Sequence, residues 1–429
     1  MTSAEDEVVD LCRDLIRFNT SNPTHPERPA AEYVAEKLSD VGLEPTMIES
    51  EPGRTSVIAR MAGTDSSRGA LLIHGHLDVV PAEAADWTVD PFSGEIQDDC
   101  VWGRGAIDMK DMDAMTLAVI RERMRQGRKP TRDVVLAFVA DEEAGSLKGA
   151  NFLVKNHAEL FEGCTDAISE VGGYSWSVNE NQRLYLIQTA EKGIAWLRLK
   201  ARGRAGHGSM LNDDNAVITL CEAVARLGRH RFPLQLIPSV EAFLREVSDA
   251  LDIEYDPKNP EATVAKVGSL ARMVGATLRH TANPSILQAG YKANVIPQTA
   301  TADVDCRFLP GRQDDFLAEV DKVIGPDVSR EFVHFDRGVE AEFEGDLIDA
   351  ICAALKAEDE GARPVPYCLS GGTDAKSFVT LGMRCYGFSP LRLPADLDFT
   401  AMFHGVDERV PIEGLKFGVR VLDRLLSTC

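Results

Sequence analysis

Two histidines and an aspartate follow a run of apolar residues near the N-terminus. The stretch LLIHGHLDVVP, residues 71–81, begins like a buried strand and then presents His74, His76 and Asp78. A strand that only built a core would continue in leucine, isoleucine and valine. Imidazole nitrogen and carboxylate oxygen are both metal ligands, so the question is which other side chains could join them.

Carboxylates recur at the ends of later apolar runs. Asp141, Glu142 and Glu143 follow VVLAFVA, Glu170 follows DAIS, and Asp108 lies in the loop VWGRGAIDMKD. Ligands in an open α/β sheet gather beyond the carboxyl ends of its strands, so we expect these side chains to meet at one sheet edge. Negative charges brought together there repel one another unless a cation neutralises them.

The donor types favour a transition metal. Imidazole and carboxylate without a nearby thiolate pair suit Zn²⁺, with Co²⁺ or Mn²⁺ as substitutes. In the adjacent pair Glu142–Glu143, one carboxylate can bind metal while the other stays free to move protons. A lone histidine after a strand, or an acidic pair in a loop, is more often structural. Ligand-type residues at three successive strand ends instead indicate hydrolysis by metal-activated water.

Alternating helices and strands are expected to position these ligands. Apolar residues at helical spacing indicate helices over 7–18, 30–42 and 111–127. Short apolar runs suited to buried strands cover 55–61, 70–75, 134–140 and 166–169. Strands separated by helices predict a layered, mostly parallel α/β sheet.

The pattern changes near residue 184. Two alternating strands flank Lys192–Gly193, residues 299–311 alternate just as clearly, and helix-like stretches lie near 214–228 and 239–251. We interpret 190–309 as a smaller α+β domain inserted into a discontinuous catalytic domain. That larger domain comprises residues 1–189 and 310–429.

Composition limits the partners and the compartment. The 429 residues carry a net charge of −22, which argues against nucleic acid or an anionic membrane surface as partner. No stretch approaches the roughly 20 apolar residues of a membrane span, and the N-terminus has no secretory signal pattern. Nine cysteines occur singly, without a CxxC pair, which indicates reduced thiols in a cytoplasmic protein.

Six motifs extend the pattern along the chain: in order, HGHLDVVP, GRGAIDMK, DEEAGS, GHGSM, SGGTDAK and FHGVDERV. Together they resemble the di-zinc metallopeptidases of the M20 family over about residues 5–425. That family includes aminoacylases, succinyl-diaminopimelate desuccinylase, acetylornithine deacetylase, glutamate carboxypeptidases and carnosinases. The resemblance implies two Zn²⁺ ions, an inserted domain that acts as lid and dimerisation domain, and a homodimer.

The resemblance also implies five metal ligands. His76 and Glu170 would hold one ion, Glu143 and His404 the other, and Asp108 would bridge the two.

Two further residues would act beside the metals. Glu142 would be the general base and acid, and Asp78 would fix the tautomer of the His76 ring. His74 is not a ligand in this interpretation.

Substrate contacts are also implied by the resemblance. His207 in GRAGHGSM would be supplied by the insert, often across a dimer, to polarise the scissile carbonyl or stabilise the oxyanion. Asn294 and Arg307 resemble the family's substrate-binding pair, and Arg307 could clamp a carboxylate. Alternatively, Arg307 pairs with a neighbouring aspartate. The turn containing Gly372 and Thr373 could offer backbone N–H groups to the same carboxylate, or could be a plain helix cap.

These residues predict hydrolysis of the amide bond in N-acyl amino acids or short peptides with a free carboxylate, as in aminoacylases and carboxypeptidases. One alternative is a succinyl-diaminopimelate desuccinylase, which needs a further basic group for the succinyl carboxylate. Another is a non-catalytic peptide-binding relative, which would lack a ligand or the base. No residue of an acyl pocket is identifiable from the sequence.

Overall fold

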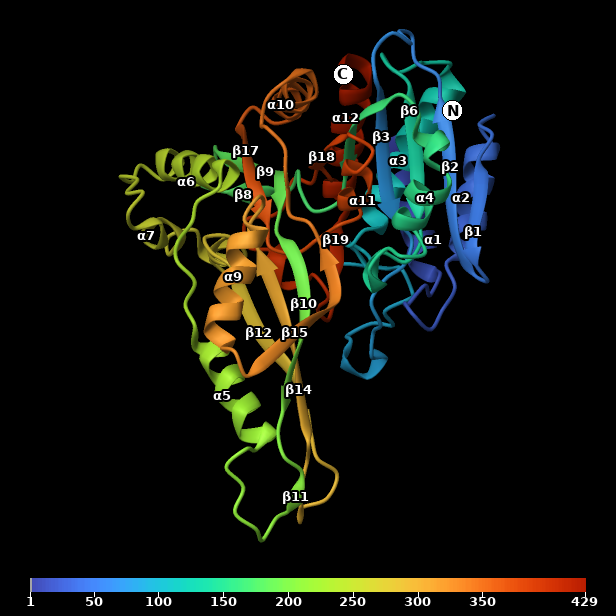
Figure 1. Cartoon of the computed structure of the whole chain (residues 1–429). Coiled ribbons are helices and arrows are strands. Elements are labelled where there is room, and N and C mark those ends of the chain that lie inside the picture. Colours follow the sequence, from blue (N-terminus) through green and yellow to red (C-terminus); the bar gives the residue numbers. More distant parts are fainter. Residues whose placement is uncertain (1) are drawn as a thin grey trace.

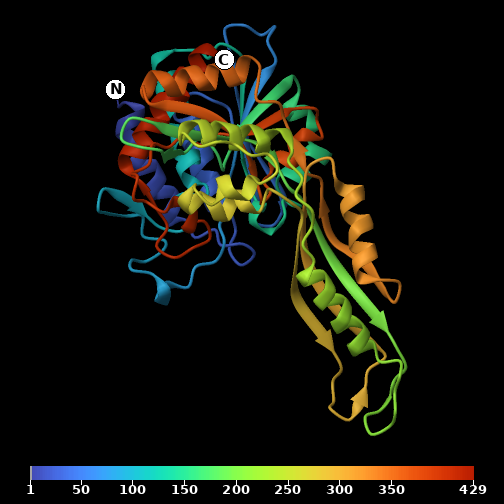
Figure 2. The same ribbon diagram turned by 90° about the vertical axis from the view of Figure 1, so that its left-hand side faces the viewer.

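A computed structural model describes residues 2–429. It has two parts, a large α/β body and a long arm that projects from it (Figure 1, Figure 2). The body carries both ends of the described chain, and the arm carries residues from the middle of the sequence.

The body is built on a ten-stranded sheet whose central strands are parallel. These central strands are, in order, β6 (Val134–Val139), β3 (Ala70–His76), β7 (Cys164–Ser169) and β18 (Arg384–Gly387). Antiparallel strands extend the sheet beside β6, namely β2 (Arg54–Met61) and β1 (Thr46–Glu51). On the other side lie β9 (Arg183–Glu191), β8 (Ser175–Ser177), β16 (Val339–Glu340) and β17 (Ala362–Leu369). The predicted layered α/β fold is confirmed.

Helices cover both faces of this sheet because successive side chains of each buried strand point to opposite faces. Leu71 and Ile73 of β3 face one core, and Leu72 between them faces another. The first core is packed by α1 (Ala4–Arg17), α2 (Arg28–Ser39), α3 (Lys110–Gln126), α10 (Asp346–Glu358) and α12 (Ile412–Thr428). The second is packed by α4 (Ala150–Asn156) and α11 (Ala375–Val379).

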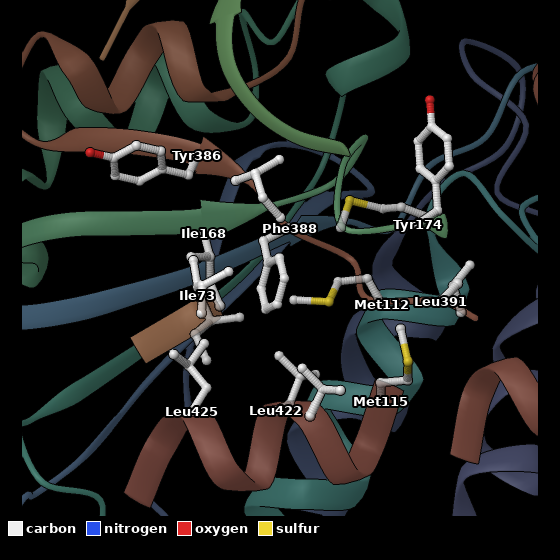
Figure 3. Packing of buried hydrophobic residues seen from close by; sticks show 14 of the residues in the cluster. Ile73, Met112, Met115, Ile168, Tyr174, Tyr386, Phe388, Leu391, Leu422 and Leu425 are labelled. Atoms are coloured by element: carbon white, nitrogen blue, oxygen red, sulfur yellow. The ribbon is translucent and has the colours of Figure 1, made fainter. Parts of the chain in front are cut away.

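Figure 3 shows the centre of the first core. Ile73 and Ile168 of the parallel strands and Phe388 lie against Leu422 and Leu425 of α12. Burying side chains of this size contributes about 1.5–3 kcal/mol each, so the strands that end at the predicted ligands are held on a rigid base.

The arm is a four-stranded antiparallel sheet covered by helices. Its strands are, in order, β12 (Thr281–Ala289), β14 (Thr299–Phe308), β10 (Gly193–Arg202) and β15 (Val328–Asp336), and α5 (Ala216–Arg229) and α9 (Gln313–Ile324) pack on it. Every second residue of β14 is buried from Ala300 to Phe308, as the sequence alternation predicts. At the far end lies a two-stranded sheet of β11 (Gly206–His207) and β13 (Val295–Ile296).

The arm differs from the predicted insert 190–309 in two ways. First, α9 and β15 belong to its core and sheet, so it continues to Asp336. Only Val328 of β15 is buried and the strand has no clear apolar alternation, which is why its sequence gives a weak signal. Second, residues 237–278, which we call the return segment, pack on the body instead of the arm.

The return segment contains α6 (Pro238–Ala250), α7 (Pro260–Val264) and α8 (Ala271–Gly275). Helices α6 and α8 lie beside β17, and α7 packs on these two helices (Figure 1). Val240, Phe243 and Leu244 of α6 are buried in the first core of the body. The helical spacing near 239–251 predicts a helix with one apolar face, but periodicity alone does not say which core that face meets.

The three-stranded sheet of β4 (Glu95–Gln97), β5 (Cys100–Trp102) and β19 (Arg409–Pro411) joins an early loop to the C-terminal region. All nine cysteines are free. Among the described residues, no helix is long and apolar enough to span a membrane.

Candidate metal centre and active site

Three neighbouring parallel strands deliver the predicted ligands to one edge of the sheet. Strand β3 ends at His76, β6 ends just before Asp141, and β7 ends just before Glu170. Because β6, β3 and β7 are adjacent and parallel, their carboxyl ends share an edge. The sequence expectation that these residues meet there is therefore met.

Two groups of ligand atoms share Asp108, and a third group joins the Glu142 carboxylate to His76 and Glu143. His76 Nε2 lies 3.2 Å from Asp108 Oδ1 and 3.3 Å from Glu170 Oε2. His404 Nε2 lies 3.3 Å from Asp108 Oδ2 and 3.2 Å from Glu143 Oε2. Each oxygen of Asp108 thus faces a different group, an arrangement suited to bridging two ions.

The hydrogen bonding of His76 fits a cation in the first group. Its Nδ1 lies 2.9 Å from the backbone carbonyl of Asp78, which can only accept, so Nδ1 carries the proton of the neutral ring. The lone pair of Nε2 then faces carboxylate oxygens of Asp108 and Glu170, which are also acceptors. A metal ion between them gives all three atoms a partner.

The charges of the cluster fit a cation as well. Burial, together with the charge of Glu170, raises the pKa of Glu142 well above its usual range, and burial raises the pKa of Glu170 to about 8. Hydrogen bonds to Asp108 and Glu143 raise the pKa of His404 to about 10. Without a metal, protons therefore neutralise part of the negative charge of the clustered carboxylates. Bound cations would neutralise the same charge.

His404 reaches the cluster because two distant loops are held together by Glu408. The fully buried Glu408 carboxylate accepts from Arg104 Nη1 at 2.8 Å and from the backbone N–H of Ile107 at 2.8 Å. Arg104 also donates to the carbonyl of Gly405 at 2.8 Å. The loop that carries Asp108 and the loop that carries His404 are therefore fixed against each other.

Asp78 supports the cluster, but through different atoms from those expected. Its backbone carbonyl, not its carboxylate, accepts from His76 Nδ1, and the nearer carboxylate oxygen is 3.8 Å away. The carboxylate instead accepts from the backbone N–H groups of Glu142 and Glu143, both at 3.0 Å. Asp78 thus orients the turn that carries the proposed base and a ligand.

Asn22 completes this support and was not predicted. Its side-chain amide donates to Asp78 at 2.9 Å and to Asp141 at 3.1 Å. Asp141 adopts a left-handed conformation (φ 67°) and its carboxylate accepts from the N–H of Lys148 at 2.9 Å. The local sequence TSNPTHP does not indicate that its asparagine contacts Asp78, 56 positions later, and Asp141, 119 positions later.

Replacing Asp78 with alanine is expected to lower the free energy of unfolding by about 3 kcal/mol. One buried and two partly buried N–H donors lose a charged acceptor, and each such bond contributes about 1.5–3 kcal/mol, with incomplete additivity. Urea unfolding of the metal-free protein measures the change, with the exposed Asp86→Ala as control. A loss below about 0.5 kcal/mol would contradict the supporting role.

His74 lies outside the cluster, as predicted. Its ring packs on Phe378 with centroids 4.7 Å apart, and neither ring nitrogen has a hydrogen-bond partner among the described residues. Burial lowers the pKa of His74 to about 3, so the ring is neutral. It serves as a core residue on the face of β3 that also carries Leu72.

His207 and Asn294 lie together at the tip of the arm, away from the ligand cluster of their own chain (Figure 1). The N–H of Gly208 donates to the carbonyl of Asn294 at 2.9 Å. Nδ1 of His207 accepts from the N–H of Ser209 at 3.2 Å, which leaves the proton of the neutral ring on Nε2. His207 is exposed, so this donor is free to meet a carbonyl oxygen from another molecule.

Arg307 lies at the base of the arm and is already paired. Its guanidinium donates to both carboxylate oxygens of Asp305, at 2.7 and 3.1 Å, as in the alternative interpretation of the sequence. Opposite Arg307 in the sheet lies Ile194, whose Cδ1 would be 3.1 Å from a Cβ added at Gly372. Arg307 therefore faces the body near Gly372.

The expectation for Thr373 is corrected. Its N–H and hydroxyl both donate to the buried carboxylate of Glu191, at 3.0 and 2.6 Å, and are not free for a substrate. The helix that follows, α11, has only five residues. Glu191 was not predicted as a partner of Thr373, because it ends a strand 182 positions earlier in the sequence. Gly372, by contrast, lines the cavity beside the metal cluster.

That cavity has a volume of about 560 Å³. Its lining includes Glu142 and four of the five clustered ligands, namely Asp108, Glu143, Glu170 and His404. The rest of the lining comes from Val171, Arg272, Met273 and Leu369, from the turn 370–372, and from the segment that precedes His404, including Phe403.

Comparison with known proteins identifies relatives along the whole chain. The sequence profile of peptidase family M20/M25/M40 matches residues 72–428. N-fatty-acyl-amino acid synthase/hydrolase PM20D1 of Xenopus tropicalis is 27% identical, over 98% of this chain and 85% of that protein. Aminoacylase-1 of Sus scrofa is 26% identical, over 99% of this chain and 95% of that protein.

Solved structures share the fold. The M20 family metallo-carboxypeptidase Sso-CP2 of Sulfolobus solfataricus superposes with a TM-score of 0.74 at 19% identity, covering 98% of each chain. The di-peptidase Dug1p of Saccharomyces cerevisiae gives a TM-score of 0.70 at 18% identity, covering 99% of this chain and 97% of that chain. With its motifs, ligand geometry and profile in agreement, the chain belongs to peptidase family M20/M25/M40.

Proposed function

We propose that this protein is a two-zinc hydrolase that cleaves the amide bond of N-acyl amino acids or short peptides carrying a free carboxylate. The observation that carries the proposal is the pair of ligand groups sharing Asp108, with the carboxylate of Glu142 beside them. If the metal centre were only structural, the five ligands would suffice, and the Glu142 carboxylate beside them would have no role.

The donor set fits Zn²⁺, which binds imidazole and carboxylate readily. His76, Asp108 and Glu170 would hold one ion, and Asp108, Glu143 and His404 the other. Bound zinc supplies polarisation of the scissile carbonyl and a lower pKa for water.

Glu142 would move the proton. Its carboxylate belongs to the same turn as Glu143 but makes no ion pair with His404. Its raised pKa favours accepting a proton from water and then delivering it to the leaving amine, at one carboxylate oxygen.

The substrate class rests on Arg307 and on the relatives. A guanidinium near the cavity favours a product amine that carries a carboxylate. Aminoacylase-1 and the N-fatty-acyl-amino acid hydrolase point, by their names, to N-acyl amino acids. A non-catalytic role is disfavoured because every ligand position and the base are present. We further propose a cytoplasmic setting, in which the nine free cysteines stay reduced.

We also propose that His207 and Asn294 act on the partner's site in a homodimer. In that case, the purified mixed dimer of the inactive variants His207→Ala and Glu142→Ala is expected to have up to about one half of wild-type activity, since one of its two sites is intact. Co-expression with two different tags and purification of the mixed dimer measures this. Recovery below about 1% in a mixed dimer of proven composition would show that His207 acts within its own chain or not at all.

A substrate panel tests the function itself. The zinc-loaded protein is assayed on N-acetyl, N-succinyl and long-chain N-acyl amino acids and on dipeptides, with Glu142→Ala as blank. Hydrolysis by the wild type alone supports the proposal. No turnover of any substrate with two metals bound, or equal turnover by the blank, would overturn it.

A further inference from the structure

A substrate with a free carboxylate needs a cation near the metal centre, and the two arginines closest to the cavity are already paired. Among the described residues that line the cavity, Arg272 is the one lysine or arginine. It donates to Asp398 at 3.0 and 3.3 Å, and its side chain is 67% exposed. Arg307, at the base of the arm, donates through Nε and Nη2 to Asp305. Each of these charges therefore already has a carboxylate partner.

Lys376 of α11 is a buried lysine beside the cavity, and its side chain is only 8% exposed. A Cβ added at Gly372, which lines the cavity, would lie 2.4 Å from Lys376 Nζ. Nζ is therefore no more than about 4 Å from Gly372 Cα, because a Cα–Cβ bond spans about 1.5 Å. The same Cβ would lie 3.1 Å from Cδ1 of Ile194, the residue opposite Arg307 in the arm sheet. The ammonium thus lies where the cavity lining meets the base of the arm.

The ammonium of Lys376 has donors to spare. Within the part of the chain that the structure describes, its one hydrogen bond is to the carbonyl of Lys192, at 2.9 Å. The carboxylate of Glu191 lies 4.0 Å away and already accepts from Gln188 at 2.9 Å. It also accepts from the N–H and the hydroxyl of Thr373, at 3.0 and 2.6 Å. Since an ammonium carries three N–H groups, two of them are left for a ligand.

The charges around Lys376 favour an anion there. Burial lowers the pKa of Lys376 below its usual range, and the charge of Arg307 adds to that shift. The charges of Glu191, Asp336 and Glu142 oppose it. Lys376 therefore lies close enough to the proposed base and to the arm to interact with both. An ammonium shielded from water gains more from a bound carboxylate than an exposed one does.

From this arrangement, and resting on the function proposed above, we infer that Lys376 binds the free carboxylate of the substrate, and that Gly372 leaves the ammonium open to it. The scissile bond must lie at the metal cluster, so this carboxylate belongs to the amine side of the amide. Lys376 is then a specificity-determining residue, because an uncharged carboxamide gains much less from a buried ammonium.

The test compares one N-acyl amino acid, the best substrate of the panel, with its C-terminal carboxamide. For the wild type, kcat/KM is expected to be about a hundredfold higher for the carboxylate. Lys376→Met should lose about a hundredfold on the carboxylate and less than about threefold on the carboxamide, so that the preference disappears. Gly372→Ala should lower the preference at least about tenfold, because its methyl group would take the place of the ammonium. Lys356→Met, an exposed lysine of α10, is the matched control and should keep wild-type values.

A second variant separates binding from a structural role. Lys376→Gln keeps an N–H donor for the carbonyl of Lys192 but removes the charge, so it should lose the carboxylate preference as Lys376→Met does. If Lys376 only held that carbonyl, Lys376→Gln would keep the preference and Lys376→Met would slow both substrates equally. Melting temperatures establish that each variant is folded.

Binding gives a readout that does not need turnover. Calorimetry on the zinc-loaded Glu142→Ala variant should show at least about tenfold tighter binding of the carboxylate than of the carboxamide, and adding Lys376→Gln should abolish the difference. A carboxylate preference that survives in both Lys376 variants, or equal losses on the two substrates, would overturn the inference while leaving the proposed hydrolysis intact. A wild type that hydrolyses no substrate of the panel would overturn the proposed function, and this inference with it.

Discussion

Glu142→Gln is expected to lower kcat/KM by about a thousandfold while both metal ions stay bound. Glutamine keeps the shape of the side chain but can neither accept the proton of water nor return it to the leaving amine. Positioned general acid–base groups contribute about a hundred- to ten-thousandfold to rate, which sets the size of the effect. The turn itself should persist, because Asp78 holds it through backbone N–H groups that the substitution leaves in place.

Steady-state kinetics on an N-acyl amino acid, with metal content measured on the same sample, checks this expectation. Glu159→Gln, an exposed residue of the same body, is the matched control and should retain wild-type values. If Glu142→Gln kept more than about a tenth of the activity, another group would be the base. If it lost metal in proportion to activity, Glu142 would be a ligand instead.

Asp108→Ala is expected to remove both metal ions, whereas His404→Ala should remove only one. The two oxygens of Asp108 face different ligand groups, while His404 takes part in the second group only. Hydrolysis should fall at least about a hundredfold in each variant, because charge stabilisation by a metal contributes several kcal/mol to the transition state.

Metal analysis after equilibration at a fixed free zinc concentration separates the two variants. His74→Ala is the control, because it removes a histidine from β3, the strand that ends at the ligand His76. His74 packs on Phe378, and its ring nitrogens form no hydrogen bond with the cluster. Retention of one full equivalent of zinc by Asp108→Ala would argue against a bridging carboxylate. Loss of both zinc equivalents by His404→Ala would argue against two ligand groups that bind zinc independently.

The sequence was sufficient to predict the strands that end at the metal ligands. The apolar runs 70–75, 134–140 and 166–169 are buried on both faces, as strands between helix layers must be, and the polar residues after them stand out for that reason. His404 is different. It lies 296 positions after Asp108 in a loop without periodicity, and only its resemblance to a family motif pointed to it.

Residues that act through long-range side-chain contacts were not predictable. Asn22 and Glu191 have ordinary local sequences, and their roles follow from the residues they contact across the fold. The end of the arm and the place of the return segment were not predicted for a similar reason, since an amphipathic helix such as α6 shows that it has an apolar face but not which core receives it. Asp78 shows an intermediate case, because its residue type indicated support of the cluster but not which of its atoms would bond.

Anomalous scattering at the zinc absorption edge, from crystals grown with zinc, tests the central claim most directly. The account predicts two peaks, one among His76, Asp108 and Glu170 and the other among Asp108, Glu143 and His404. Zinc bound elsewhere, or a single peak at saturating zinc, would contradict the assignment of a two-metal centre to these five side chains.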